Sequence, residues 1–343
     1  MSMSWRALLA LSVLLQAPAA HADTLEEALA AAHRNNPTLE EARLAVRAAR
    51  QDRVQAAAAY WPTLGVSASI GAQDVEIESS SIFGPSSNES RTNPRSTNVD
   101  LTQSLFTGGR RLGVTRLARA NVEGAQHGLR ATEQDILLAA VDAYLSVQRD
   151  EEVLRLREAD VEGLTRQLAG TRRRLDVGEV SRTDLAQTQT RLAGARAALS
   201  RSRAELEASR ARYEQIIGHA PAELAPVITL PNVAPTLSAA VTEAETQHPD
   251  LMRARSSERA ARARTTIERA ALLPQVSITG RYEYSDDATY ETDRREGTSA
   301  VARFSLPIFE GGLAASRAHQ SEINVQRAEA LTEARRREIV ANV

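Results

Sequence analysis

Hydrophobic residues recur every seven positions in two long stretches of this chain, and the two stretches mirror each other about residue 180. Heptad spacing is typical of a coiled-coil seam. The pattern therefore predicts an antiparallel helical hairpin over about residues 109–217. Its seam residues are Val147, Leu154, Val161, Leu168 and Leu175 on the first helix, and Leu185, Leu192, Leu199, Leu206 and Tyr213 on the second.

The turn between the two predicted helices has residues suited to ending one helix and starting another. Gly178 can adopt the left-handed conformation that ends a helix. Ser181 is a predicted N-cap, and Asp184 stands three residues later, where it completes a capping box. The sequence thus predicts a short, well-defined turn at the tip of the hairpin.

Two other regions show the two-residue alternation of β-strands. Leu64, Val66, Ala68 and Ile70 alternate with small or polar residues, and similar patterns predict strand pairs over about 63–106 and 275–309. The polar stretches between the strands, 79–98 and 286–297, are expected to be surface loops. About ten residues per strand is enough to cross a bilayer at a tilt, but a soluble hairpin packed on a helix would show the same alternation.

The number of strands limits how they can serve in a membrane. Four strands cannot close a barrel, because small barrels need about eight. A membrane form would therefore pool strands from several chains: two chains would supply eight and three would supply twelve. An open edge in lipid would leave backbone groups unsatisfied, so such a form must assemble.

An internal duplication organises the chain. Residues from Thr24 match residues from Thr236 at an offset of 212, which aligns Pro37 with Pro249. We therefore expect a first repeat over 23–235, with a linker at 218–235, and a second repeat over 236–343, with a helix from about residue 312. Compared with the first repeat, the second repeat lacks the helical hairpin, so the chain is expected to be C-terminally incomplete.

The first 22 residues are typical of a secretory signal peptide. Arg6 precedes an apolar run, and Ala20-His21-Ala22 forms a cleavage site of the small-x-small type. Cleavage near Ala22 is expected. The apolar run is too short to cross a bilayer as a helix, and no later segment is longer.

Composition and charge exclude several classes of function. All 42 basic residues are Arg, and 44 acidic residues bring the net charge to -2, which gives no bulk attraction to nucleic acid. Zero Cys excludes disulfides, thiolate chemistry and an N-terminal lipid anchor on Cys. The six His lack ligand spacing, and no nucleophile or phosphate-loop motif is present, so the sequence predicts no metal, no cofactor and no enzyme.

Three motifs together resemble the TolC family of outer membrane efflux proteins, especially its branch in type I secretion. They are "TLEEALAAAHRNNP" at 24–37, "LTQSLFTGG" at 101–109 and "RRLDVGEVSRTDLAQTQTRLAGARAAL" at 173–199. The resemblance implies an α+β membrane protein of a Gram-negative outer membrane. In it, a homotrimer pools four strands per chain in a 12-stranded β-barrel embedded in outer-membrane lipid, and coiled-coil hairpins continue it as a periplasmic α-barrel.

The resemblance also implies a passive exit duct of a tripartite export system, serving type I protein secretion or efflux of drugs and other small molecules. The hairpin tip would dock to a periplasmic adaptor, or membrane fusion, protein that links it to an inner-membrane ABC or proton-driven transporter. The second tip, which narrows the closed pore in the family, is absent, so no gate residues are assigned. The residues of the docking tip are Val177, Gly178, Glu179, Ser181, Thr183 and Asp184.

A second hypothesis is a soluble periplasmic coiled-coil adaptor or structural protein, because adaptors also carry helical hairpins. The two strand pairs at matched positions disfavour it. The cargo is not specified by the sequence.

Overall fold

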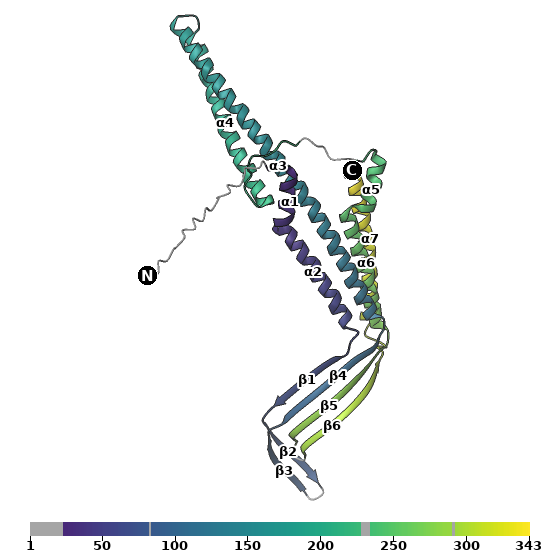
Figure 1. Cartoon of the computed structure of the whole chain (residues 1–343). Coiled ribbons are helices and arrows are strands. Elements are labelled where there is room, and N and C mark those ends of the chain that lie inside the picture. Colours follow the sequence, from purple (N-terminus) through teal and green to yellow (C-terminus); the bar gives the residue numbers. More distant parts are fainter. Residues whose placement is uncertain (1–22, 82–83, 228–233, 290–291) are drawn as a thin grey trace, which may run out of the picture. The chain divides into compact units, whose positions relative to one another are not determined.

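The computed structural model describes residues 23–81, 84–227, 234–289 and 292–343 (Figure 1). They divide between two compact units: Met1–Glu41 with Thr132–Val233, and Ala42–Ala131 with Ala234–Val343. The predicted signal peptide, its cleavage site at Ala22 and part of the predicted linker lie outside the described residues. Two helices, α2 (Pro37–Ala58) and α3 (Arg110–Asp176), contribute residues to both units.

The first unit contains the helical hairpin. Helix α3 is 67 residues long and is followed by α4 (Arg182–Ile217). The short helix α1 (Leu25–Asn35) begins at a capping box in which Thr24 and Glu27 each accept a hydrogen bond from the other's backbone N–H. Alanines of α1 pack with Tyr144 of α3 and Tyr213 of α4 in the buried core of this unit.

The second unit contains the remaining helices, α5 (Leu237–Gln247), α6 (Pro249–Arg269) and α7 (Leu313–Asn342), and a 3₁₀ turn at Ala270–Leu272. Helices α5 and α6 begin 212 positions after α1 and α2, the offset of the duplication found in the sequence. Pro37 and Pro249 are the first residues of α2 and α6, where a missing N–H costs no helical hydrogen bond.

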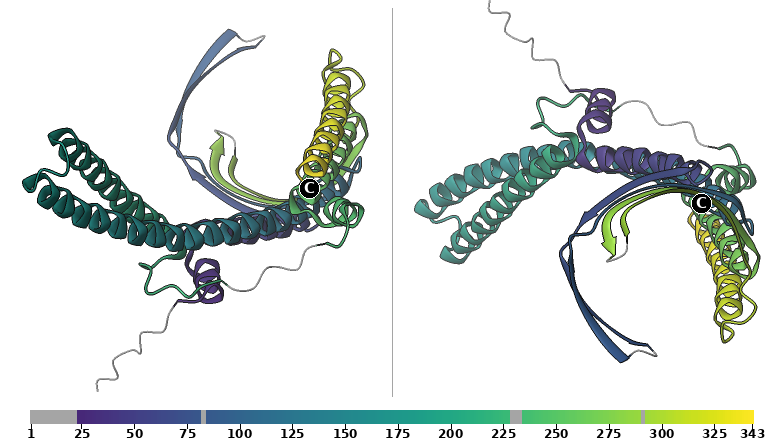
Figure 2. Two further views of the ribbon diagram at one scale, coloured as in Figure 1. Left: turned by 90° about the horizontal axis from the view of Figure 1, so that it is seen from above. Right: turned by 90° about the horizontal axis from the view of Figure 1, so that it is seen from below.

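Four strands of the second unit form an antiparallel sheet in the order β1-β4-β5-β6. They are β1 (Thr63–Ile70), β4 (Arg95–Thr107), β5 (Gln275–Thr289) and β6 (Thr292–Ser305). Figure 2 shows that these strands follow a curved sheet. Among the described strands, β1 and β6 each pair on one side only, so the sheet has two open edges.

The expectation of surface loops between the predicted strands was wrong in both places. Residues 73–81 and 84–92 form a separate antiparallel pair, β2 (Gln73–Ser81) and β3 (Gly84–Thr92), and β5 and β6 extend through most of 286–297. Backbone pairing satisfies the same hydrogen bonds whether the side chains are polar or apolar. A ladder can therefore continue where the hydrophobic signal of a strand has ended.

The register gives the four-stranded sheet one apolar face and one polar face. Val66 lies opposite Val99, which lies opposite Tyr282. On the polar face, the Arg281 Nε donates to an Asp100 carboxylate oxygen at 2.6 Å. A register shift between Ser104 and Phe106 leaves Leu105 without a partner in β5 and brings Phe106 opposite Val276.

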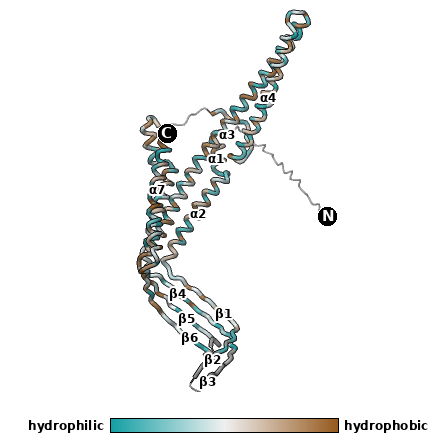
Figure 3. The backbone as a smooth tube through the Cα atoms, turned by 180° about the vertical axis from the view of Figure 1, so that it is seen from behind, coloured by the Kyte–Doolittle hydropathy of each residue, from teal (hydrophilic) through white to brown (hydrophobic). Residues whose placement is uncertain are grey.

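The compact units cut across the two predicted repeats, because β4 of the first repeat pairs with β5 of the second. Figure 3 shows hydrophobic residues gathered where α6 and α7 meet the strands, and mixed colours along α3 and α4. None of the helices in the described part of the chain has the length and apolar character needed to cross a membrane.

Candidate functional site

The tip of the hairpin begins with a Schellman motif at the end of α3. The Glu179 N–H donates to the Arg174 carbonyl at 2.8 Å, and the Gly178 N–H donates to the Leu175 carbonyl at 3.0 Å. Gly178 has φ of 78°, a left-handed conformation that a side chain would strain. Two carbonyl groups that would otherwise lack hydrogen-bond donors at the end of the helix therefore accept hydrogen bonds within the turn.

A capping box starts α4, as the sequence predicts. The Asp184 N–H donates to the Ser181 hydroxyl oxygen at 3.2 Å, and the Ser181 N–H donates to an Asp184 carboxylate oxygen at 2.9 Å. Hydrogen bonds from the Ser181 hydroxyl and backbone hold the pKa of Asp184 below its usual value. The negative charge also lies in the first turn of α4, where it interacts favourably with the helix dipole.

The turn presents the predicted tip residues to solvent. Val177 is 73% exposed, and a salt bridge of 3.0 Å joins Arg174 to Glu179 across the turn. An apolar side chain surrounded by charged and hydroxyl groups is suited to contact with another protein. The six predicted tip residues are all exposed: Val177, Gly178, Glu179, Ser181, Thr183 and Asp184.

Below the tip, the predicted seam residues are shielded from solvent. None of the ten is exposed. Val147, Leu168, Leu192, Leu206 and Tyr213 are buried, and Leu154, Val161, Leu175, Leu185 and Leu199 are partly buried.

On α4, the second core position of each heptad was not found from the hydrophobic pattern. Thr188, Ala195 and Ser202 are buried, and Ser209 is partly buried. These residues also recur every seven positions. Each lies three positions after a seam leucine, so together with the leucines they occupy the two core positions, a and d, of each heptad. Their spacing was a usable signal, but residues this small and polar do not register in a hydrophobic pattern.

Polar contacts fix how α3 and α4 align. Arg203 bonds to Glu158 at 3.2 Å and Arg210 bonds to Glu151 at 3.0 Å. The Ser209 hydroxyl donates to the buried Asp150 carboxylate. The two members of each pair lie within one position of equal distance from residue 180, close to the register that the mirrored heptads predict.

A second group that sequence reasoning missed is the Asp23 clasp, formed by Asp23, Tyr144, Tyr213, Glu223 and Ala225. The Tyr144 hydroxyl donates to the Asp23 carbonyl at 2.7 Å and lies 2.6 Å from the Ala225 carbonyl. The Asp23 N–H donates to the Glu223 carbonyl at 2.8 Å. Burial, aided by the Asp23 carboxylate, raises the pKa of both tyrosines. About 200 residues separate Asp23 from Ala225, so no local pattern could reveal the clasp.

The described residues offer no arrangement of three or more His, Asp or Glu side chains that could hold a metal ion. At the tip, Glu179 is paired with Arg174, and Asp184 is hydrogen-bonded to Ser181. The geometry is therefore that of an exposed, locally hydrogen-bonded turn at the end of a long helical hairpin.

Comparison with known proteins extends over most of the chain. The family described as "Outer membrane efflux protein" matches residues 28–219 and 240–343. The chain is 29% identical to the outer membrane efflux protein BepC of Brucella suis biovar 1 over 318 residues, which cover 92% of this chain and 67% of BepC. It is 27% identical to the outer membrane protein TolC of Escherichia coli K12 over 269 residues, which cover 74% of this chain and 54% of TolC.

The fold also matches solved structures. A crystal structure of CusC, in a study of its folding and transmembrane channel formation, aligns with a TM-score of 0.75 and 20% identity, covering 93% of this chain and 72% of CusC. The chain spans about two thirds of BepC and about half of TolC. The family match over both halves of the chain confirms the resemblance found in the sequence: the chain belongs to the outer membrane efflux protein family.

Proposed function

We propose that this chain forms the outer-membrane exit duct of a tripartite export system and acts as a passive conduit without catalysis. The observation that carries the proposal is the two-faced sheet. Its apolar face is uncovered within the chain: Leu64 and Val66 are 70% and 69% exposed. Uncovered apolar residues on a sheet whose other face is polar fit contact with lipid on one side and water on the other.

The open edges of the sheet support assembly of several copies. In hydrocarbon, each unsatisfied backbone group on β1 and β6 would cost several kcal/mol, so another copy must pair with these edges. We infer a homotrimer with a 12-stranded barrel, as in the resemblance to the TolC family. Residues 1–22 would direct export and be removed near Ala22.

Large apolar residues where strands meet helices fit the edge of a membrane. Ile308 and Phe309 are 93% and 86% exposed just after β6, and Trp61 is exposed just before β1. Aromatic side chains are favoured at the membrane–water interface. These residues would mark the periplasmic edge of the lipid-embedded region.

We propose that the exposed tip, from Val177 to Asp184, docks to a periplasmic adaptor protein. The adaptor would connect the duct to an inner-membrane ABC or proton-driven transporter, which supplies the energy. Both type I protein secretion and efflux of small molecules fit this arrangement. A photoreactive amino acid at position 177 should crosslink to a periplasmic protein in cells, whereas one at the exposed position Ser200, within the hairpin, should not.

The decisive test of the duct is made on cells that express the full chain, fractionated into soluble periplasm and outer membranes, with the membrane fraction extracted in detergent. Native mass spectrometry should show trimers, and the protein should produce stepwise conductance in planar lipid bilayers. A stable monomer recovered from the soluble periplasm, without conductance, would refute the duct and favour the adaptor hypothesis.

A further inference from the structure

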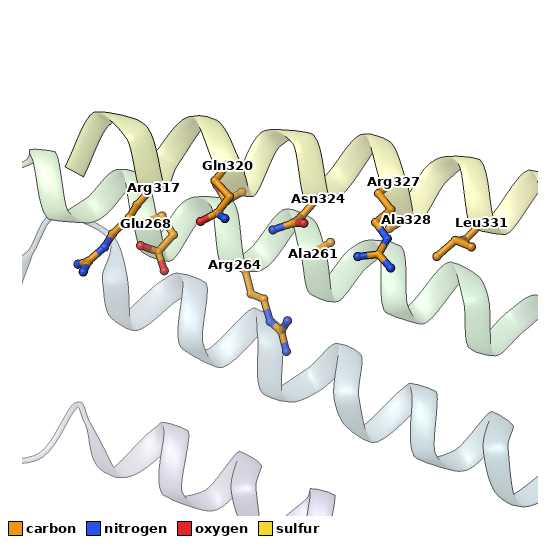
Figure 4. A pocket seen from close by; sticks show the side chains of 10 residues that line it. Ala261, Arg264, Glu268, Arg317, Gln320, Asn324, Arg327, Ala328 and Leu331 are labelled. Atoms are coloured by element: carbon orange, nitrogen blue, oxygen red, sulfur yellow. The ribbon is translucent and has the colours of Figure 1, made fainter. Parts of the chain in front are cut away.

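Helices α6 and α7 of the second unit enclose a polar groove of about 520 Å³. Figure 4 shows Arg317, Gln320, Asn324 and Arg327 in one row on the side of α7 that faces α6. Arg264 of α6 lines this groove and also the adjacent groove between α6 and α3. The spacing of the α7 residues, three or four positions apart, places them on one helical face.

The groove is unbalanced in charge. Arg264, Arg317 and Arg327 line it together with a single carboxylate, Glu268, and Figure 4 shows the Arg264 side chain extending from α6 on the side away from α7. Within the described part of the chain, none of these three arginines makes a salt bridge or hydrogen bond. A guanidinium group stays charged at any physiological pH, so the groove holds an uncompensated positive potential.

Other arginines on the same two helices form salt bridges with glutamates of the partner helix. Arg262 contacts Glu329 at 2.9 Å, and Arg269 contacts Glu322 at 2.6 Å. These salt bridges link α6 and α7 outside the groove. Pairing between α6 and α7 therefore does not account for Arg264, Arg317 and Arg327, which line the groove without such partners.

Two further lining residues of the groove carry neutral amide donors. The amides of Gln320 and Asn324 lie between Arg317 and Arg327 along α7. Guanidinium groups bind phosphate oxygens in a two-pronged manner, and amide N–H groups can complete the set of donors. The combination matches a ligand with several anionic oxygens and no need for a metal.

We propose that this groove is a binding site for a polyvalent phosphate-type oxyanion, held by Arg264, Arg317 and Arg327 with help from Gln320 and Asn324. The site stands on the groove and its charges and does not depend on the proposed export function. A free phosphorylated solute and a phospholipid headgroup share this chemistry. The experiment distinguishes the two sources.

In the test, full-chain protein in neutral detergent is titrated with inorganic pyrophosphate at low ionic strength, and isothermal titration calorimetry measures the binding. Binding should weaken as salt is added. The double variant R317Q/R327Q should bind about tenfold more weakly or worse, because each charged hydrogen bond contributes strongly. The matched control, R335Q/R337Q, removes two arginines of α7 that are paired with Glu338 and Glu333 outside the groove, and should bind as the original chain does.

Wild-type protein that does not bind pyrophosphate, or an equal loss in both variants, would overturn the proposal. Protection of arginines from phenylglyoxal provides a second measurement that needs no variant. Pyrophosphate should protect Arg264, Arg317 and Arg327; protection without any added anion would assign the groove to contact between copies and also overturn the proposal. Displacement of pyrophosphate by micelles containing phosphatidylglycerol would identify a headgroup as the ligand, and no displacement would identify a free solute.

Discussion

The α3–α4 hairpin and the four-stranded sheet both carry regular apolar positions, but only the hairpin covers its own. Its seam residue Leu206 is 3% exposed, whereas Leu64 on the apolar face of the sheet is 70% exposed. The hairpin pattern therefore encodes packing within one chain. The pattern of the sheet encodes a surface that something outside the chain must cover, which is why the same kind of periodicity has different consequences in the two regions.

Removing the same side chain from both regions should expose this difference most strongly. Leu206→Ala should lower the free energy of unfolding by about 2–5 kcal/mol, because it leaves a cavity in the seam. Leu64→Ala should cost about 1 kcal/mol or less in detergent, because little protein packs on that residue. Urea unfolding followed by circular dichroism measures both. Equal losses would contradict the contrast between the two regions.

Adjacent residues of β1 offer a comparison between the two faces of the sheet. Val66→Arg places a charge on the proposed lipid face and should destabilise the membrane form by about 2–4 kcal/mol. Ser67→Arg places the same charge on the polar face, in the row that contains Asn98 and Glu283, and should be tolerated. Heat-modifiable mobility of trimers from outer membranes is the readout. Comparable trimer yields for the two variants would argue against lipid on the Val66 face.

Much of the fold could be predicted from sequence because its elements carry strong periodic signals. The heptads located both hairpin helices, and the duplication aligned Pro37 with Pro249, each of which begins a helix in the structure. The pair β2–β3 could not be found this way, since polar strands lack a hydrophobic face. The bulge at Ser104–Phe106 depends on pairing with β5, which is about 170 residues distant, so local alternation could not reveal it.

The candidate tip was predictable for a different reason: its structure is local. Gly178, Ser181 and Asp184 form their motifs with residues at most five positions away. The Asp23 clasp and the groove of Arg264 and Arg317 join elements that are distant in sequence, and arginine occurs on every described α-helix except α5. A residue type so abundant gives no signal until the structure shows which arginines lack partners.

Changes to the tip should have intermediate effects, because the tip is exposed but locally ordered. Gly178→Ala should cost about 1–2 kcal/mol, since alanine is strained at φ of 78° although space is available for its side chain. Ser181→Ala should cost about 0.5–2 kcal/mol by removing the cap of α4. Urea unfolding of the helical signal measures both.

Ser200→Ala is the matched control for the cap, because Ser200 is exposed in the middle of α4. It should be neutral or slightly stabilising, since alanine favours helix more than serine does. If Ser181→Ala were as harmless as this control, the capping box would not contribute to stability.

The smallest expected effect concerns the buried Asp150 carboxylate, which links α3 to Ser209 of α4 in the hairpin. Hydrogen bonds from Arg149 and Ser209 hold the pKa of Asp150 below its usual value of 3.8. The folded state therefore binds this proton less readily than the unfolded state, and the resulting stabilisation is present above pH 3.8 and is lost as the pH falls below it. Urea unfolding at pH 6 and pH 3 should show a larger acid-induced loss in the original chain than in Asp150→Asn, which cannot titrate. An unchanged pH dependence in that variant would mean that the Asp150 carboxylate, although buried in the hairpin, does not couple protonation to its folding.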